Sequence, residues 1–115
     1  MVLMQNELDR IMGRITNTLS SSARDSLRKV VLYGSYARGD YANGSDVDIM
    51  VLVDAPNPDN IYAVIKSGVD DLSLEHLVMI SCHFQNYEHF YKAIGSTSFY
   101  KAVEREGVVY FDASK

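Results

Sequence analysis

The chain has few cysteines, few prolines and no long hydrophobic run among its 115 residues. Its single cysteine, Cys82, excludes a disulfide framework within the chain and favours a reducing compartment. Because no stretch of about 18 apolar residues occurs, we expect no membrane-spanning helix. The first residues contain neither a basic segment nor a long apolar one, so we expect no secretory signal and a cytoplasmic location.

Positive charge is also scarce. The chain has 11 Lys and Arg residues against 15 Asp and Glu residues, which gives a net charge of −4. An extended nucleic-acid-binding surface needs clustered Lys and Arg, so this class of function is disfavoured. A small nucleotide, or a protein that presents one hydroxyl group, fits the charge better. His76, His83 and His89 do not have metal-ligand spacing, and no P-loop lysine or Cys-x-x-Cys motif is present.

Apolar residues make up 47% of the chain, enough for the core of one domain over residues 1–115. Apolar periodicity and turn residues predict an alternation of helices and strands, in the order αβαβαβααβ. The expected fold class is α/β (α+β), with a mixed central β-sheet flanked by helices. The expected helices are 4–20, 35–38, 58–73, 86–94 and 97–106, and the expected strands are 29–33, 47–53, 76–84 and 108–111.

The first candidate site is the turn that follows the first expected strand. Gly34 has no side chain to block close approach of a ligand to the backbone, and Ser35 is expected to cap a short helix that runs to about Arg38. Free amides at the start of a helix favour an anion such as a triphosphate, and Arg38 lies one turn further on. The alternative is that Gly34 and Ser35 only end a strand and cap a helix.

The second candidate site is the pair Asp46 and Asp48, at the start of an otherwise apolar run. On a strand, two such carboxylates lie on one face, about 6.6 Å apart, where both can bind a divalent metal. Asp46 can alternatively be read as a turn residue after Asn43 and Gly44. Asp48 is harder to explain in this way, because a buried carboxylate without a partner is unfavourable.

Together these residues resemble a known signature. Residues 33–39 (YGSYARG) followed by residues 45–48 (SDVD) resemble the minimal nucleotidyltransferases, small members of the DNA polymerase β-like nucleotidyltransferase superfamily. The resemblance implies a nucleotidyltransferase fold, ATP or another nucleoside triphosphate as substrate, and Mg²⁺ held by Asp46 and Asp48. It also implies phosphate binding by Gly34, Ser35 and Arg38. Many minimal members pair, as antitoxins, with a helical toxin of the HEPN type, and some transfer AMP to a tyrosine of that toxin.

The chain departs from the family pattern at one position. Catalytic members carry a third carboxylate on the strand after the second long helix, and we place that position at Met79 or, less well, Leu77. Glu75 and His83 are expected about 13 Å from Met79 along the strand, on opposite sides of it, and so out of reach of the same metal. Asp70 and Asp71 are expected to face solvent. Loss of a general base costs roughly 10²–10⁴-fold in rate.

Two main hypotheses follow, and they belong to different functional classes. The first is an enzyme that transfers a nucleotidyl group, which the resemblance implies is AMP, with weak or absent activity. The second is a non-catalytic antitoxin that neutralises a HEPN-type toxin by contact, through the first helix or through the region of Phe90, Tyr91, Phe99 and Tyr100. A nucleotide sensor is a third reading.

Overall fold

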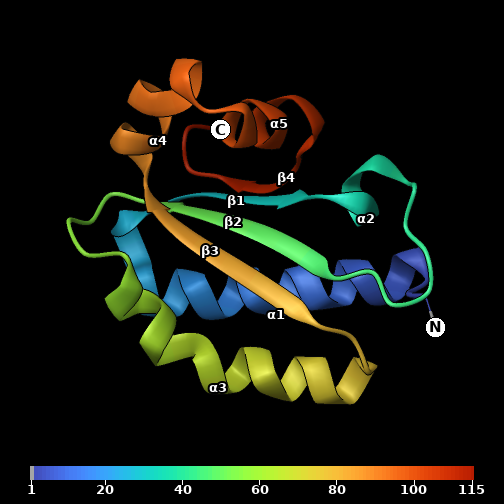
Figure 1. The fold of residues 1–115 in the computed structure, drawn as a ribbon. Coiled ribbons are helices and arrows are strands. Elements are labelled where there is room, and N and C mark those ends of the chain that lie inside the picture. Colours follow the sequence, from blue (N-terminus) through green and yellow to red (C-terminus); the bar gives the residue numbers. More distant parts are fainter. Residues whose placement is uncertain (1) are drawn as a thin grey trace.

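The computed structural model describes residues 2–115 as a four-stranded mixed sheet with helices on both faces (Figure 1). The elements in chain order are α1 (Gln5–Ala23), β1 (Leu27–Tyr33), α2 (Ser35–Arg38), β2 (Val47–Val53), α3 (Asp59–His76), β3 (Ile80–Asn86), α4 (Tyr87–Ala93), α5 (Ser98–Glu106) and β4 (Val108–Asp112). Short 3₁₀ turns follow α1 and α4. This architecture confirms the fold class that the sequence predicts.

The strands are arranged in the order β3-β2-β1-β4. Strand β1 pairs antiparallel with both β2 and β4, whereas β2 and β3 are parallel and are joined by α3. Parallel strands need a long crossover, and α3 provides it. The final strand, β4, lies at a sheet edge. No helix in residues 2–115 is long and apolar enough to cross a membrane.

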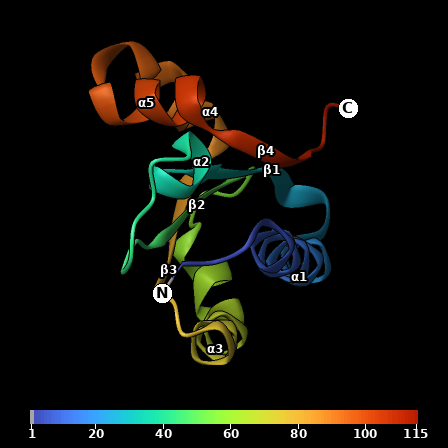
Figure 2. The same ribbon diagram turned by 90° about the vertical axis from the view of Figure 1, so that its right-hand side faces the viewer.

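One face of the sheet is covered by α1 and α3, which lie side by side below it in Figure 2. The stripe that predicts α1 is the surface that it buries: Leu8, Ile11, Met12, Ile15 and Leu19 are all buried. These residues pack against the odd-numbered side chains of β2, Val47, Ile49, Val51 and Val53. Because strand side chains alternate between faces, the even-numbered residues of β2 must point to the other side.

The opposite face is covered by α4 and α5. Met50 and Leu52 of β2, together with Val31 of β1, pack there against Phe90 and Val103. Asp48 has the same parity as Met50 and therefore lies on this face, at the end of the strand near α2. This placement determines which helix can line a site built around Asp48.

Several element boundaries differ from the expectations by a few residues, and two of these differences are informative. Helix α1 continues to Ala23, whose buried side chain extends the stripe by one more turn. The strand expected over 76–84 is wrong at its start, since His76 is the last residue of α3 and β3 begins at Ile80. His76 is buried one turn after Leu72 and so continues the helical stripe, and the Leu77 N–H bonds to the carbonyl of Ser73.

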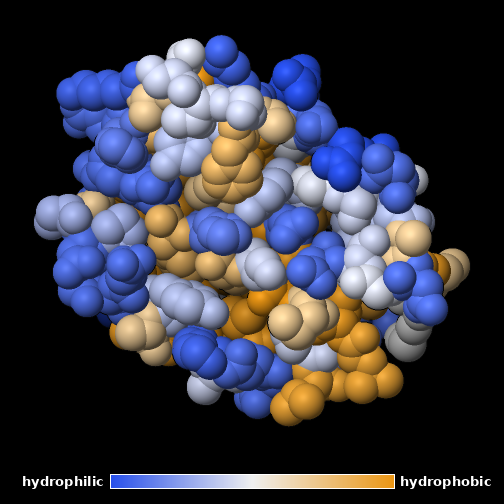
Figure 3. Space-filling view, viewed as in Figure 1, coloured by the Kyte–Doolittle hydropathy of each residue, from blue (hydrophilic) through white to orange (hydrophobic). Residues whose placement is uncertain are grey.

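An apolar patch is exposed where α3 ends and the chain turns towards β3. Figure 3 shows hydrophobic atoms gathered over this end of α3. Leu74, Leu77 and Met79 are 74%, 75% and 67% exposed, respectively, and together with Ser73 and Val78 they line a shallow depression of about 360 Å³. We call these three residues the α3-end patch. Asp70 and Asp71, on the same helix, are exposed as expected.

Candidate functional site

The turn after β1 has the conformation that the sequence suggests, with one correction. Gly34 occupies the N-cap position of α2, and Ser35 is the first helical residue rather than the cap. The carbonyl of Gly34 accepts hydrogen bonds from the amides of Ala37 and Arg38, at 3.1 and 3.0 Å. The amides at the start of a helix have no partner within it, so the turn offers donors to an anion.

Gly34 is required at this position by both its backbone and its surroundings. Its φ of +79° is one that residues with a side chain rarely adopt. A Cβ atom at Gly34 would overlap the carboxylate of Asp48. The backbone of the Gly34 turn therefore packs directly against this carboxylate. The two candidate sites that the sequence predicts, the turn and the aspartate pair, are thus adjacent in the fold.

Asp48 carries an electrostatic cost in this position. Burial raises the pKa of its carboxyl group, and the nearby charge of Asp46 raises this pKa further, while His83 and Arg38 oppose the increase. Asp46 is exposed just before β2 begins, and Asp48 is half-buried. A cation between the two carboxylates would relieve this strain, and carboxylate oxygens are the ligands that Mg²⁺ prefers. The donor set therefore fits a magnesium ion.

Among residues 2–115, no third acidic side chain lies close enough to complete a metal-binding group with this pair. Strand β3 reads Ile-Ser-Cys-His-Phe-Gln-Asn and contains no acidic residue. Within residues 2–115, no group of three or more His, Cys, Asp and Glu side chains could hold a metal. Glu75 lies in the last turn of α3, which covers the opposite face of the sheet, and is paired with Arg14 at 3.1 Å.

The register of β3 shows what stands in the place of the third carboxylate. Asp48 pairs with Ser81 and Met50 pairs with His83. Met79 lies before the strand, where its carbonyl accepts a hydrogen bond of 2.9 Å from the Val47 amide. Ser81 and not Met79 therefore lies beside Asp48, so His83 is only two residues, about 6.6 Å, further along β3 and on the same face. His83 thus lies nearer to Asp48 than the sequence suggests.

A cavity of about 330 Å³ lies between α2 and α5, over the end of β1. The Gly34 turn and Asp48 form one side of it, and one face of α5 forms the other. The sequence reasoning missed the α5 residues, although their spacing of i, i+3, i+4 and i+7 marks a single helical face. The residues that line the cavity are Tyr33, Gly34, Ser35, Arg38, Asp48, Phe99, Ala102, Val103 and Glu106.

Arg38, the candidate phosphate-binding side chain, lines this cavity. Its guanidinium group donates to Asp40 at 3.1 Å and approaches Glu106 to 3.8 Å. The side chain is 42% exposed, so both pairs are accessible to solvent. Exposed ion pairs contribute little to stability, and an incoming phosphate can compete for this guanidinium.

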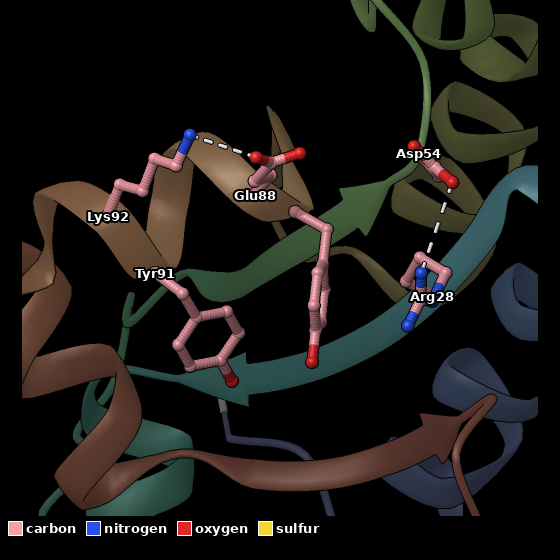
Figure 4. Close-up of a pocket in the computed structure, with 6 residues that line it drawn as sticks. Arg28, Asp54, Glu88, Tyr91 and Lys92 are labelled. Carbon is pink, nitrogen blue, oxygen red and sulfur yellow. Dashed lines mark ion pairs between the residues drawn. The ribbon is translucent and has the colours of Figure 1, made fainter.

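A larger cavity, of about 450 Å³, lies at the other end of β1 (Figure 4). Its charged groups already have partners, since Lys92 reaches Glu88 at 2.9 Å and Arg28 approaches Asp54 to 4.0 Å. Arg28 also lies 4.5 Å from the centre of the Tyr87 ring. This cavity has no adjacent pair of carboxylates and no glycine turn, so the smaller cavity is the better candidate site.

Comparison with known proteins gives consistent results. Residues 14–110 match the family model described as "Nucleotidyltransferase domain". Two proteins of Methanocaldococcus jannaschii, named "Putative protein adenylyltransferase MJ0604" and "Putative protein adenylyltransferase MJ0141", are 34% and 36% identical to this chain over 103 residues. The matches cover 90% and 89% of this chain and 97% of each relative.

The fold also matches solved structures. One, described as "Crystal structure of the toxin-antitoxin with AMP-PNP", superposes with a TM-score of 0.59 at 19% identity. The match covers 94% of this chain and 74% of that one. At this level of identity the likeness concerns the fold.

Proposed function

Since the chain belongs to the nucleotidyltransferase domain family, we propose that it binds a nucleoside triphosphate with Mg²⁺ and transfers AMP to a hydroxyl group of a protein. The observation that carries the proposal is the close packing of the Gly34 backbone against Asp48. It supports the proposal because the turn that we propose binds phosphate and the carboxylate that we propose binds metal line one cavity. The names of the two archaeal relatives support AMP as the transferred group.

Each proposed role follows from position. The first amides of α2 and the Ser35 hydroxyl donate to the triphosphate, and Arg38 neutralises part of its charge. Asp46 and Asp48 would hold Mg²⁺, which when bound stabilises the negative charge that develops on the phosphates. The acceptor hydroxyl oxygen forms a bond to the α-phosphorus and its proton passes to solvent. The bond from the α-phosphorus to the oxygen that bridges to the β-phosphorus breaks, and pyrophosphate leaves.

We further propose that the transfer is slow. The strand residue beside Asp48 is Ser81, and β3 carries no acid that could deprotonate the acceptor. A general base contributes about 10²–10⁴-fold in rate. We therefore expect transfer from labelled ATP to be slower by this factor than in a relative with three carboxylates, and equal rates would contradict this part of the proposal.

The central test is the Mg²⁺ dependence of nucleotide binding. We expect Asp46→Asn and Asp48→Asn each to abolish Mg²⁺-dependent ATP binding, measured by calorimetry, because each removes a charged metal ligand. Asp54→Asn is the matched control, since Asp54 is 72% exposed and lies at the other end of the sheet. Unchanged binding in the first two variants would refute the site.

One observation favours a second candidate function, that of a non-catalytic antitoxin. The α3-end patch exposes three large apolar side chains, and contiguous exposed apolar surface is typical of protein interaction sites. It lies next to Asp46, since Met79 joins the strand end there. Co-purification with a helical HEPN-type toxin, without labelling by ATP, would support this function. Loss of the complex in Leu74→Asp would assign the surface.

A further inference from the structure

Three aromatic rings from separate elements meet beside the carboxylates. The centre of the Phe99 ring lies 5.5 Å from that of Tyr33, at an angle of 74°, and 6.2 Å from that of His83, at 73°. Tyr33 and His83 are themselves 6.3 Å apart. The rings come from α5, β1 and β3, so sequence spacing alone could not show that they are close.

Phe99 is held firmly yet remains open to solvent. The two edge-to-face contacts, and a third contact with Tyr100 at 5.8 Å, fix the orientation of its ring. It nevertheless remains 45% exposed and lines the same cavity as Gly34 and Asp48. An exposed, preorganised aromatic surface inside a polar cavity is suited to stacking against a planar ligand.

The neighbouring residues leave room for such a ligand. Ala102 lies on the same face of α5, one turn after Phe99, and its short side chain does not fill the cavity. The opposite wall of the cavity is formed by the Gly34 turn, with Ser35 and Arg38. A molecule with a planar aromatic group at one end and a polyphosphate at the other matches both walls.

We propose that Phe99, supported by Tyr33 and His83, forms the subsite that stacks against the nucleobase of the bound nucleotide. This inference rests on the proposed function, since it assumes a nucleotide in the cavity. Phe99 is in this view a binding residue that is separate from the phosphate and metal site. Phe99 stacks against the planar base, whereas the α2 turn contacts only the phosphates and the two aspartates bind only the metal.

The test compares two probes in the presence of Mg²⁺: ATP, and inorganic tripolyphosphate, which lacks a base. We expect Phe99→Ala and Phe99→Leu to weaken ATP binding by about 5- to 150-fold, the range for loss of one base–aromatic stack, and to leave tripolyphosphate binding unchanged. Phe99→Tyr keeps the ring and should retain ATP affinity. Tyr62→Ala is the matched control, because its ring pairs with Phe84 on the other face of the sheet.

The possible outcomes distinguish failure of the base subsite from failure of the proposed nucleotide-binding function. Unchanged ATP affinity in Phe99→Leu, or an equal loss for both probes, would overturn the base subsite while the phosphate and metal site stands. If the wild-type protein bound neither probe, the proposed function and the subsite would both be wrong. Thermal unfolding of each variant verifies that it is folded.

Discussion

At the scale of single residues, Gly34 is where fold and site meet. It ends β1, caps α2 and lets the backbone approach Asp48, and no other residue type can do all three. The chain thus accepts a carboxylate whose pKa is raised by burial and by Asp46. Sites of this kind lower stability in return for function.

Replacement of Gly34 should therefore affect both stability and binding. We expect Gly34→Ala to lower the free energy of unfolding by about 3 kcal/mol, from backbone strain and overlap with Asp48, and to abolish binding of ATP with Mg²⁺. Gly39→Ala is the control, since Gly39 also has a positive φ, of +87°, but has open space around it. It should lose only about 1–2 kcal/mol and keep its affinity. Urea unfolding and calorimetry measure the two quantities, and retained affinity in Gly34→Ala would contradict the role of this contact.

At the scale of the elements, the end of α3 shows a local conflict. Leu77 adopts the left-handed conformation, with φ of 53° and ψ of 48°, which closes the helix but is unfavourable for a residue with a side chain. Its side chain is 75% exposed, so burial does not compensate for this strain. A role of the α3-end patch in binding would explain why leucine occupies this position.

Glycine at this position should stabilise the protein. We expect Leu77→Gly to raise the free energy of unfolding by about 1 kcal/mol, because glycine adopts the left-handed conformation without strain. Leu74→Gly is the matched control within α3, where an equally exposed leucine should lose about 1 kcal/mol. Chemical denaturation distinguishes the two, and a loss of stability in Leu77→Gly would show that its side chain contributes to the fold.

At the scale of the whole molecule, the two faces of the sheet differ in the size of the core that each buries and in which of them carries the candidate site. The face towards α1 and α3 holds the larger core, and the face towards α4 and α5 holds a smaller one and the cavity. Phe90 of α4 packs against Tyr100 of α5, with the two ring centres 4.6 Å apart. The α5 wall of the site therefore depends on the smaller core.

Mutations in the two cores should differ in their effect on binding. Phe90→Ala should lower the free energy of unfolding by about 3–5 kcal/mol and also weaken ATP binding, because α5 loses its support. Ile11→Ala, in the other core, should cost about 2–5 kcal/mol and leave the affinity of the folded protein unchanged. Denaturation curves with calorimetry on the folded protein make the comparison, and equal affinity in both variants would contradict this division.

The sequence alone determined the element order, the Gly34–Ser35 turn, the Asp46–Asp48 pair and the lack of an acid on the third strand. These features follow from local periodicity, from glycine conformation and from residue type, which a chain carries without its fold. The site assignments themselves remain predictions. Only the tertiary structure decided the register of β3, and with it the pairing of Ser81 with Asp48 and the approach of His83.

The tertiary structure also decided that α5 lines the cavity. Periodicity reports that a helix has an apolar face, but it does not report which surface that face meets. The register of paired strands and the packing of layers depend on contacts between residues far apart in the chain. The role of Phe99 therefore became visible only once α5 was in place on the sheet.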